Sequence, residues 1–400
     1  MINKMKKLIV KVFDCLGFEI RRKKTKRAVV FDYRKYLQTD KSEFNKNKRA
    51  LVSYLVNPLL ISPQRIKFSN DGIALAIPRV LNELGYIVDV VNWDDLNFVP
   101  EKKYNLFIGH GGCNFEQIAR NLSSNAVKIY FSMGIYWKEC NQREAERFCQ
   151  LKQRRGRSLP YDRWITYSEE YANCSADAII CLGNEYAKES YLKFPFTLNL
   201  NNAAYPDDRY DRTMKNFVSA RNNFLFFSGG GNVHKGLDLL LEAFVQVNDA
   251  HLYICQSISS DFYEVYRHEF EDHPNIHLIG PLKMRSSKFY KLMDKCAFVI
   301  HPSCAEGQQG SVIECMLQGL IPMVSRDTNM DVNDFGIMLN TCCIKEIVET
   351  VQDLSQRSPK WCKETSQRTH KIAITDYSEE TFLSNLRNHI KHIIEKASAK

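Results

Sequence analysis

The sequence predicts an α/β protein with two doubly wound, Rossmann-like domains that face a central cleft. Three observations predict this class. The chain has 400 residues, which is more than one typical core needs. Short apolar runs alternate with helical patterns from Arg49 onward, as in parallel sheets covered on both faces. The alternation restarts after a polar stretch at 201–223, which reads as a linker between two domains.

The first unit is expected to span residues 28–215. Its helical pattern is IALAIPRVLNELG, at residues 73–85. Its strands are expected in the apolar runs RALVSYLV, YIVDVVNW, YNLFIGHGG, AVKIYFSMG and ADAIICLG.

The second unit, residues 216–375, repeats the alternation. Its strands are expected in NFLFFSGGG, HLYICQ, NIHLIG, CAFVI and IPMVS, and KGLDLLLEAF is expected to be a helix. The tail at 376–400 has apolar residues at the spacing of an amphipathic helix, including Phe382, Leu386 and Ile390. This helix is expected to pack back on the first domain.

The N-terminal residues 1–27 carry most of the net charge. They contribute +8 of the total of +9, and the remaining residues are close to neutral. An apolar stripe from Leu8 to Leu16 precedes the basic run at 21–27, which is typical of a basic amphipathic segment on a membrane surface. We expect a cytoplasmic protein with weak attachment to the anionic inner face of the plasma membrane. A solvated basic tail is the alternative.

A glycine-rich turn joins a predicted strand to a predicted helix at 224–244. Gly229, Gly230 and Gly231 permit positive φ and close backbone approach, and Lys235 lies where the helix begins. An anion at this point would meet an ammonium group and free amides. The turn therefore predicts a phosphate site, with a tight turn and a solvated lysine as the alternative.

Two glutamates lie eight positions apart in the segment that starts at His301. Glu306 falls in the loop, and Glu314 falls about one turn into the helix that follows. The amides around Gln309, Gly310 and Ser311 form the helix N-terminus between them. Carboxylates accept hydrogen bonds from sugar hydroxyls, and helix amides bind phosphate. The arrangement suits a nucleotide-diphosphate sugar, although a surface glutamate is the alternative for Glu314.

These motifs resemble the C-terminal domain of retaining glycosyltransferases of the GT-B fold, family 4, also called group 1. The matching segments are KGLDLLLEAF and HPSCAEGQQGSVIE, which contains the family's pair of glutamates. The resemblance implies the following roles: Glu306 at the donor sugar; Glu314 at the ribose; Lys235 and the Gly310 and Ser311 amides at the diphosphate; the Gly280–Met284 loop with Leu282 at the base; His110 as a cleft histidine. It also implies donor contacts for Gly229, Gly230, Gly231, Gly307 and Gln309. By the same resemblance, the unit at 28–215 is expected to be the acceptor domain and the unit at 216–375 the nucleotide-sugar donor domain.

One departure from the family pattern concerns the glycine turn. The family often has an arginine at the position that Gly230 occupies here. Lys235 is then expected to carry more of the phosphate charge, or to share it with another cation such as Arg285.

No metal and no cofactor is expected besides a UDP- or GDP-linked co-substrate. The 13 cysteines include no C-x-x-C pair, and Asp207 and Asp208 read as a solvated turn. Balanced charge beyond residue 27 argues against nucleic acid as a partner. The basic stretch at 151–164 is a candidate contact for a glycan or lipid-linked acceptor, with an exposed basic loop as the alternative.

The expected activity is transfer of a sugar to an acceptor hydroxyl with retention at the anomeric carbon, in surface polysaccharide or glycolipid synthesis. Lys235, Glu306 and His110 are the catalytic candidates. Two alternatives remain open from the sequence: a nucleotide-sugar 2-epimerase on the same scaffold, and a noncatalytic partner subunit.

Overall fold

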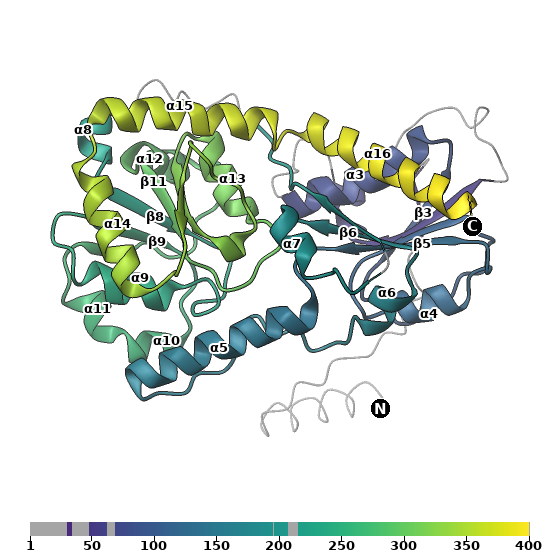
Figure 1. The fold of residues 1–400 in the computed structure, drawn as a ribbon, viewed down its shortest axis with the longest axis horizontal. Coiled ribbons are helices and arrows are strands. Elements are labelled where there is room, and N and C mark those ends of the chain that lie inside the picture. The colour runs from purple at the N-terminus through teal and green to yellow at the C-terminus, as the bar shows by residue number, and fades with distance from the viewer. Residues whose placement is uncertain (1–29, 34–47, 62–68, 195, 207–214, 400) are drawn as a thin grey trace, which may run out of the picture.

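Two sheets, each with helices on both faces, form the molecule (Figure 1). The computed structural model describes residues 30–33, 48–61, 69–194, 196–206 and 215–399. The basic segment 1–27, Asp207 and Asp208 lie outside the described residues. No helix among the described residues is long and apolar enough to cross a bilayer.

The first sheet has seven strands in the order β1-β3-β2-β4-β5-β6-β7. All neighbours are parallel except β1 and β3, which are antiparallel. The inner strands are apolar on both faces because helices cover both. The strands are β1 (Phe31–Asp32), β2 (Arg49–Tyr54), β3 (Ile87–Asn92), β4 (Leu106–Gly109), β5 (Val127–Ser132), β6 (Ala178–Leu182) and β7 (Thr197–Leu200).

Helix α3 covers one face of this sheet, and α4 and α6 cover the other. Helix α7 follows β6, and its N-terminus is capped by the side chain of Asn184. The helices are η2 (Asn57–Leu60), α3 (Ser69–Glu83), α4 (Phe115–Arg120), α5 (Trp137–Arg155), α6 (Glu170–Ser175) and α7 (Glu185–Glu189).

The second sheet has six parallel strands in the order β10-β9-β8-β11-β12-β13. The order reverses at β8, which has β9 on one side and β11 on the other. Ligands of such sheets bind beyond the carboxyl ends of the strands at this reversal. The strands are β8 (Asn223–Phe227), β9 (His251–Cys255), β10 (Ile276–Leu278), β11 (Phe298–His301), β12 (Ile321–Ser325) and β13 (Ile337–Leu339).

Helices α9 and α14 pack on one face of the second sheet, and α12, α13 and α15 pack on the other. The helices of this half are α8 (Phe217–Ala220), α9 (Leu237–Phe244), α10 (Ser260–Val265), α11 (Arg267–Glu271), α12 (Ser287–Lys295), α13 (Gly310–Leu317), η5 (Arg326–Thr328), α14 (Ile344–Gln356), α15 (Pro359–Thr375) and α16 (Glu379–Ser398).

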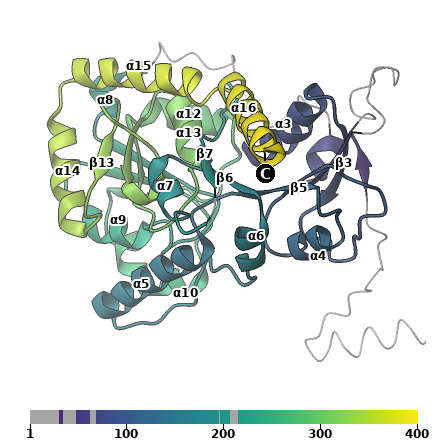
Figure 2. The ribbon, with the colours of Figure 1, turned by 45° about the vertical axis from the view of Figure 1, so that its right-hand side comes forward.

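Helices α16 and α5 each link one half of the molecule to the other. Helix α16 buries Phe382, Leu386 and Ile390 in the core of the first sheet, where it lies beside α3 (Figure 2). Helix α5 starts beside the first sheet, but Phe148 and Leu151 near its end are buried in the core of the second sheet. Each half therefore contributes a helix to the other.

Two arginines of the basic stretch at 151–164 pair with carboxylates of the second half. Arg154 pairs with Asp238 and Glu242, and Arg155 pairs with Glu242 and Glu269. Most of the other residues of the stretch are exposed, so it stays a candidate acceptor contact.

Candidate functional site

The glycine turn after β8 forms one wall of a cavity at the reversal of the second sheet. Gly230 and Gly231 have φ values of 154° and 89°, which favour glycine. A Cβ on Gly231 would lie 2.8 Å from Cγ of Arg163. The turn thus lets a side chain from the first half of the chain lie directly on its backbone.

Lys235 follows this turn and is held against the loop after β11. Gly236 has φ 82° and lies so close to Pro302 that a Cβ would be 2.3 Å from the Pro302 carbonyl oxygen. The amide of Cys304 donates to the carbonyl of His234 at 2.9 Å. This close packing brings Lys235 to Glu306, and the two side chains form an ion pair.

The charges of this pair are strongly coupled because water is largely excluded. Burial raises the pKa of Glu306, but the charge of Lys235 outweighs it, and the pKa falls to about 2. Burial also lowers the pKa of Lys235, and the Glu306 carboxylate opposes that effect. A negatively charged ligand here would compete with Glu306 for the ammonium group.

Glu314 lies at the other end of the cavity, on α13. It is buried, so the alternative of a surface glutamate is wrong. Its Oε1 accepts a hydrogen bond from Arg285 at 2.8 Å, and Arg285 also donates to the backbone carbonyl of Tyr205. Arg285 is thus engaged with Glu314, which contradicts the expectation that it assists Lys235.

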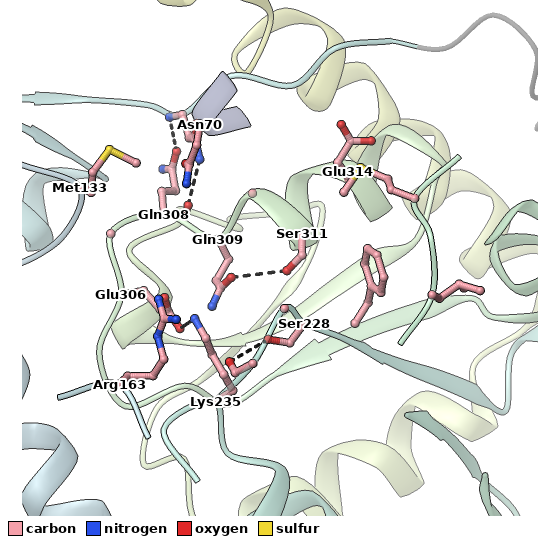
Figure 3. A pocket seen from close by; sticks show the side chains of 18 of the residues that line it. Asn70, Met133, Arg163, Ser228, Lys235, Glu306, Gln308, Gln309, Ser311 and Glu314 are labelled. Atoms are coloured by element: carbon pink, nitrogen blue, oxygen red, sulfur yellow. Dashed lines mark hydrogen bonds and ion pairs between the residues drawn. The ribbon is translucent and has the colours of Figure 1, made fainter. Parts of the chain in front are cut away.

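The cavity between these groups has a volume of about 680 Å³. Figure 3 shows Lys235 and Glu306 at one end and Glu314 at the other, with Ser311 between them on α13. Of the residues predicted from the sequence, the following line it: Gly229, Gly230, Lys235, Leu282, Glu306, Gly307, Gln309, Gly310, Ser311 and Glu314. Gly231 lies behind this lining, and His110 lies elsewhere.

His110 lies in an adjoining cavity of about 350 Å³, which also touches Glu306 and Gly307. Its Nδ1 is 3.0 Å from the carbonyl oxygen of Phe131. Burial lowers the pKa of His110 to about 4, although this hydrogen bond opposes the change. The ring is therefore neutral at pH 7, with Nδ1 as the donor, and is suited to orient a ligand rather than to supply a proton.

Sequence reasoning missed Arg163 as a site residue. Arg163 lines both cavities, and its side chain ends next to the Lys235–Glu306 pair (Figure 3). Its amide and that of Asp162 donate to Glu144, and Asp162 accepts from the amide of Val233. The available signal was the position of Arg163 in a basic stretch with aromatic residues.

Glu144, Asp162 and His234 come within 4.8 Å of one another, a spacing that a metal ion could use. Both carboxylates already accept backbone amides, which fasten the 162–163 segment to the glycine turn. His234 donates from Nε2 to the carbonyl oxygen of Ala305 and faces Glu144 through Nδ1 at 3.6 Å. These contacts explain the cluster as a clip that positions Arg163.

The loop after β11 also contacts the first half directly. The amide of Ile135 donates to the carbonyl of Glu306 at 3.3 Å, and Asn202 donates to Gln308 through both its amide and its side chain. A Cβ on Gly307 would lie 1.9 Å from the carbonyl oxygen of Met133. Only glycine at 307 allows this approach.

Glu169, which is 5% exposed, lines the adjoining cavity and was not predicted. Burial raises its pKa to about 7, while the nearby hydroxyl of Tyr130 opposes the rise. The folded protein thus holds a proton on Glu169 that the unfolded chain releases near pH 4.5. Below pH 4.5 the Glu169 carboxyl does not lower the free energy of unfolding. As the pH rises from 4.5 to 7, the free energy of unfolding falls, because the unfolded chain releases this proton and the folded protein keeps it.

We therefore expect Glu169→Gln to flatten the pH dependence of stability. The variant should gain about 3 kcal/mol in unfolding free energy relative to the wild type between pH 5 and pH 8, because it carries no buried charge. Urea unfolding at the two pH values measures this. The control Glu170→Gln removes an exposed carboxyl next in sequence. An equal gain in the control would rule out burial of Glu169 as the cause.

Comparisons with known proteins agree with this geometry. Residues 221–357 match a family model described as "Glycosyl transferases group 1". Similar solved structures include TarM of S. aureus, with a TM-score of 0.50, 18% identity and coverage of 71% of this chain. The chain spans 54% of the length of that TarM chain. A search of curated proteins found no match.

Two other similar structures are covered almost completely. Sucrose-phosphate synthase from Thermosynechococcus elongatus has a TM-score of 0.58 at 12% identity, and the match covers 87% of this chain and 99% of that one. HepE from Anabaena, in complex with UDP-glucose, has a TM-score of 0.54 at 12% identity, with 86% and 99% covered. These are GT-B structures, so the predicted fold is confirmed.

Proposed function

We propose that this protein transfers a sugar from a nucleotide donor to an acceptor hydroxyl with retention at the anomeric carbon, because residues 221–357 match the group 1 glycosyltransferase family model and the fold is GT-B. The observation that carries the proposal is the single cavity with the Lys235–Glu306 pair at one end and Glu314 at the other. A nucleotide sugar has its diphosphate between two rings, which matches this order of cation, helix N-terminus and carboxylates.

In the proposed reaction the bond between the anomeric carbon and the diphosphate breaks while the acceptor oxygen bonds to that carbon from the same face. Lys235 and the N-terminus of α13 stabilise the charge that develops on the leaving diphosphate. The departing phosphate oxygen takes the proton of the acceptor hydroxyl. Glu306 orients the donor sugar, and Glu314, together with Arg285, is placed to bind the ribose.

Donor binding is the first test of this function. HepE binds UDP-glucose, so UDP-glucose heads a panel of UDP- and GDP-sugars. At least one should raise the melting temperature of the protein, because a ligand that binds only the folded state stabilises it. Mass spectrometry of donor and candidate glycan acceptors then detects the transferred sugar. A panel without any stabilising donor would contradict the proposal.

The adjoining cavity favours a transferase over a 2-epimerase. It meets the donor cavity at Glu306 and Gly307 and has its own volume of about 350 Å³, which an epimerase acting on the donor alone does not need. The intact Lys235–Glu306 pair favours catalysis over a noncatalytic role. NMR of donor incubated without acceptor should show no change in the configuration of the sugar at C2.

We propose that Arg163 supplies the second cation for the diphosphate. Arg163→Met should lower kcat/KM by roughly tenfold to a hundredfold, because hydrogen bonds to charged groups are worth about 1.5–3 kcal/mol. Steady-state kinetics with the identified donor measures the change. Arg157→Met is the control, since it removes an exposed arginine from the same segment. Equal kcat/KM values for Arg163→Met and the control would show that Arg163 does not bind the diphosphate.

We propose that the diphosphate is neutralised by these cations and helix amides without a metal ion. Activity should then persist after dialysis against EDTA, and added Mg²⁺ should change kcat by less than about twofold, since a required metal would contribute far more.

For the biological setting, we propose surface polysaccharide or glycolipid synthesis at the inner membrane face. Liposome flotation with and without residues 1–27 tests the membrane contact.

A further inference from the structure

The adjoining cavity has walls that differ in character from those of the donor cavity. Tyr54, Trp93, His110 and Tyr167 contribute rings to its lining, and Glu169 contributes a carboxyl group. The donor cavity, in contrast, is lined largely by a glycine turn, a helix N-terminus and charged groups. The two share a boundary at Glu306 and Gly307, so a ligand in one lies next to a ligand in the other.

The aromatic rings form a connected wall with fixed orientations. The ring of Trp93 lies 5.5 Å from that of His110 and 5.6 Å from that of Tyr167, and Tyr54 meets His110 edge-on at 5.4 Å. Gly111, with φ 69°, lets the backbone approach Trp93, where a Cβ would be 2.9 Å from the indole. The wall is therefore held in place before any ligand arrives.

Glu169 is a buried carboxyl in the lining of the same cavity. Gly112 approaches the 168–169 backbone so closely that a Cβ would be 2.0 Å from the carbonyl oxygen of Ser168, which fixes the start of α6. Burial disfavours the charge of Glu169, as its raised pKa shows. A ligand that donates hydrogen bonds to the carboxylate would offset that cost. A phosphate group would instead add negative charge beside it, and the cation of this lining, Arg163, is the one that we assign to the donor diphosphate.

We propose that this cavity seats one uncharged sugar ring, the acceptor's terminal residue, with its apolar face on the Trp93 and Tyr167 rings and a hydroxyl donating to Glu169. Sugar rings combine an apolar face with hydroxyl donors around the edge, which is the combination that these walls match. The inference rests on the proposed transferase function and narrows its acceptor to a glycan end. Any phosphate or lipid of the acceptor would lie outside this cavity.

Saturation-transfer difference NMR on the full chain tests the proposal. The probes are UDP, methyl glycosides of glucose, galactose and N-acetylglucosamine in both anomeric forms, and glycerol 3-phosphate. At pH 8 we expect ring protons of at least one glycoside to receive saturation from the wild type. Glu169→Gln should raise the Kd for that glycoside by about tenfold or more, because a charge-assisted hydrogen bond becomes a neutral one. The UDP signal should stay unchanged in the variant.

The controls separate this proposal from the proposed function. Glu170→Gln, at an exposed neighbouring carboxyl, should bind the glycoside as the wild type does. Trp93→Leu provides a second variant, and it should also lose glycoside binding while it keeps UDP. UDP binding without any glycoside, or glycoside binding that both Glu169→Gln and Trp93→Leu leave intact, would overturn the acceptor site. Saturation transfer to glycerol 3-phosphate, without transfer to any glycoside, would overturn the acceptor site as well. Glycoside binding that depends on Glu169 without UDP binding would uphold the sugar site and contradict the donor function.

Discussion

Lys235→Met should lower kcat by about 10² or more, because the variant loses the charge that stabilises the leaving diphosphate in a site that excludes water. The ammonium group is buried and has Glu306 as its ion-pair partner, so no solvent replaces it. Steady-state kinetics at saturating donor measures the loss. Lys371→Met, at an exposed position on α15, is the matched control and should keep the wild-type rate.

The Lys235–Glu306 pair also makes a prediction about coupling. Lys235→Met leaves the Glu306 carboxylate buried without its cation, which should destabilise the fold by about 3–5 kcal/mol. The double variant Lys235→Met/Glu306→Gln should recover much of that stability and remain inactive, since it removes both charges. Urea unfolding and kinetics on the three proteins separate a folding defect from a catalytic one. A double variant as unstable as Lys235→Met would show that the charges act independently.

Gly307→Ala should lower kcat/KM by on the order of a hundredfold, because a displacement of about 1 Å in an active site can cost that much. The new Cβ would lie 1.9 Å from the Met133 carbonyl oxygen, so the loop that carries Glu306 would have to withdraw from the first half. The hydrogen bond from Ile135 to Glu306 would be lost with it. UDP binding, measured by calorimetry, should change less than the rate.

A glycine variant away from the cleft serves as the control for Gly307→Ala. Gly156 follows α5 with φ 66°, and a Cβ there would meet nothing within 4 Å. Gly156→Ala should lose about 1 kcal/mol of stability, because alanine is strained at positive φ, and keep the wild-type rate. Wild-type turnover by Gly307→Ala would show that the two halves do not need this contact.

The strands of both halves could be predicted because they are buried on both faces. RALVSY and AIICL are nearly continuous apolar runs, which only a strand covered on two sides places entirely inside. Strands β1, β7 and β13 were not predicted, since two to four residues at a sheet edge carry no period. The strand-to-helix loops could be located because they follow such runs. Lys235, Glu306 and Glu314 lie in or just after these loops, so the sequence could single them out as candidates.

Residues that reach the site from another part of the chain could not be predicted. Arg163 is held by the Glu144 clip, and Glu169 is held by the contact of Gly112 with Ser168. These contacts join residues that are 19 and 56 positions apart in sequence. Helix α5 was not predicted from the sequence, and neither was the packing partner of its far end. Whether Phe148 faces one sheet or the other depends on how the halves dock, and no local pattern records that.

The exchange of helices between the halves bears on how the molecule comes apart. Removal of either half would leave α5 or α16 with an uncovered apolar stripe, so neither is a portable module that could be expressed alone. Phe148 and Leu151 of α5 are buried in the core of the second sheet, although α5 starts beside the first sheet. We therefore expect the two cores to unfold together. A single calorimetric transition, rather than two successive ones, is the behaviour that this interlocking implies.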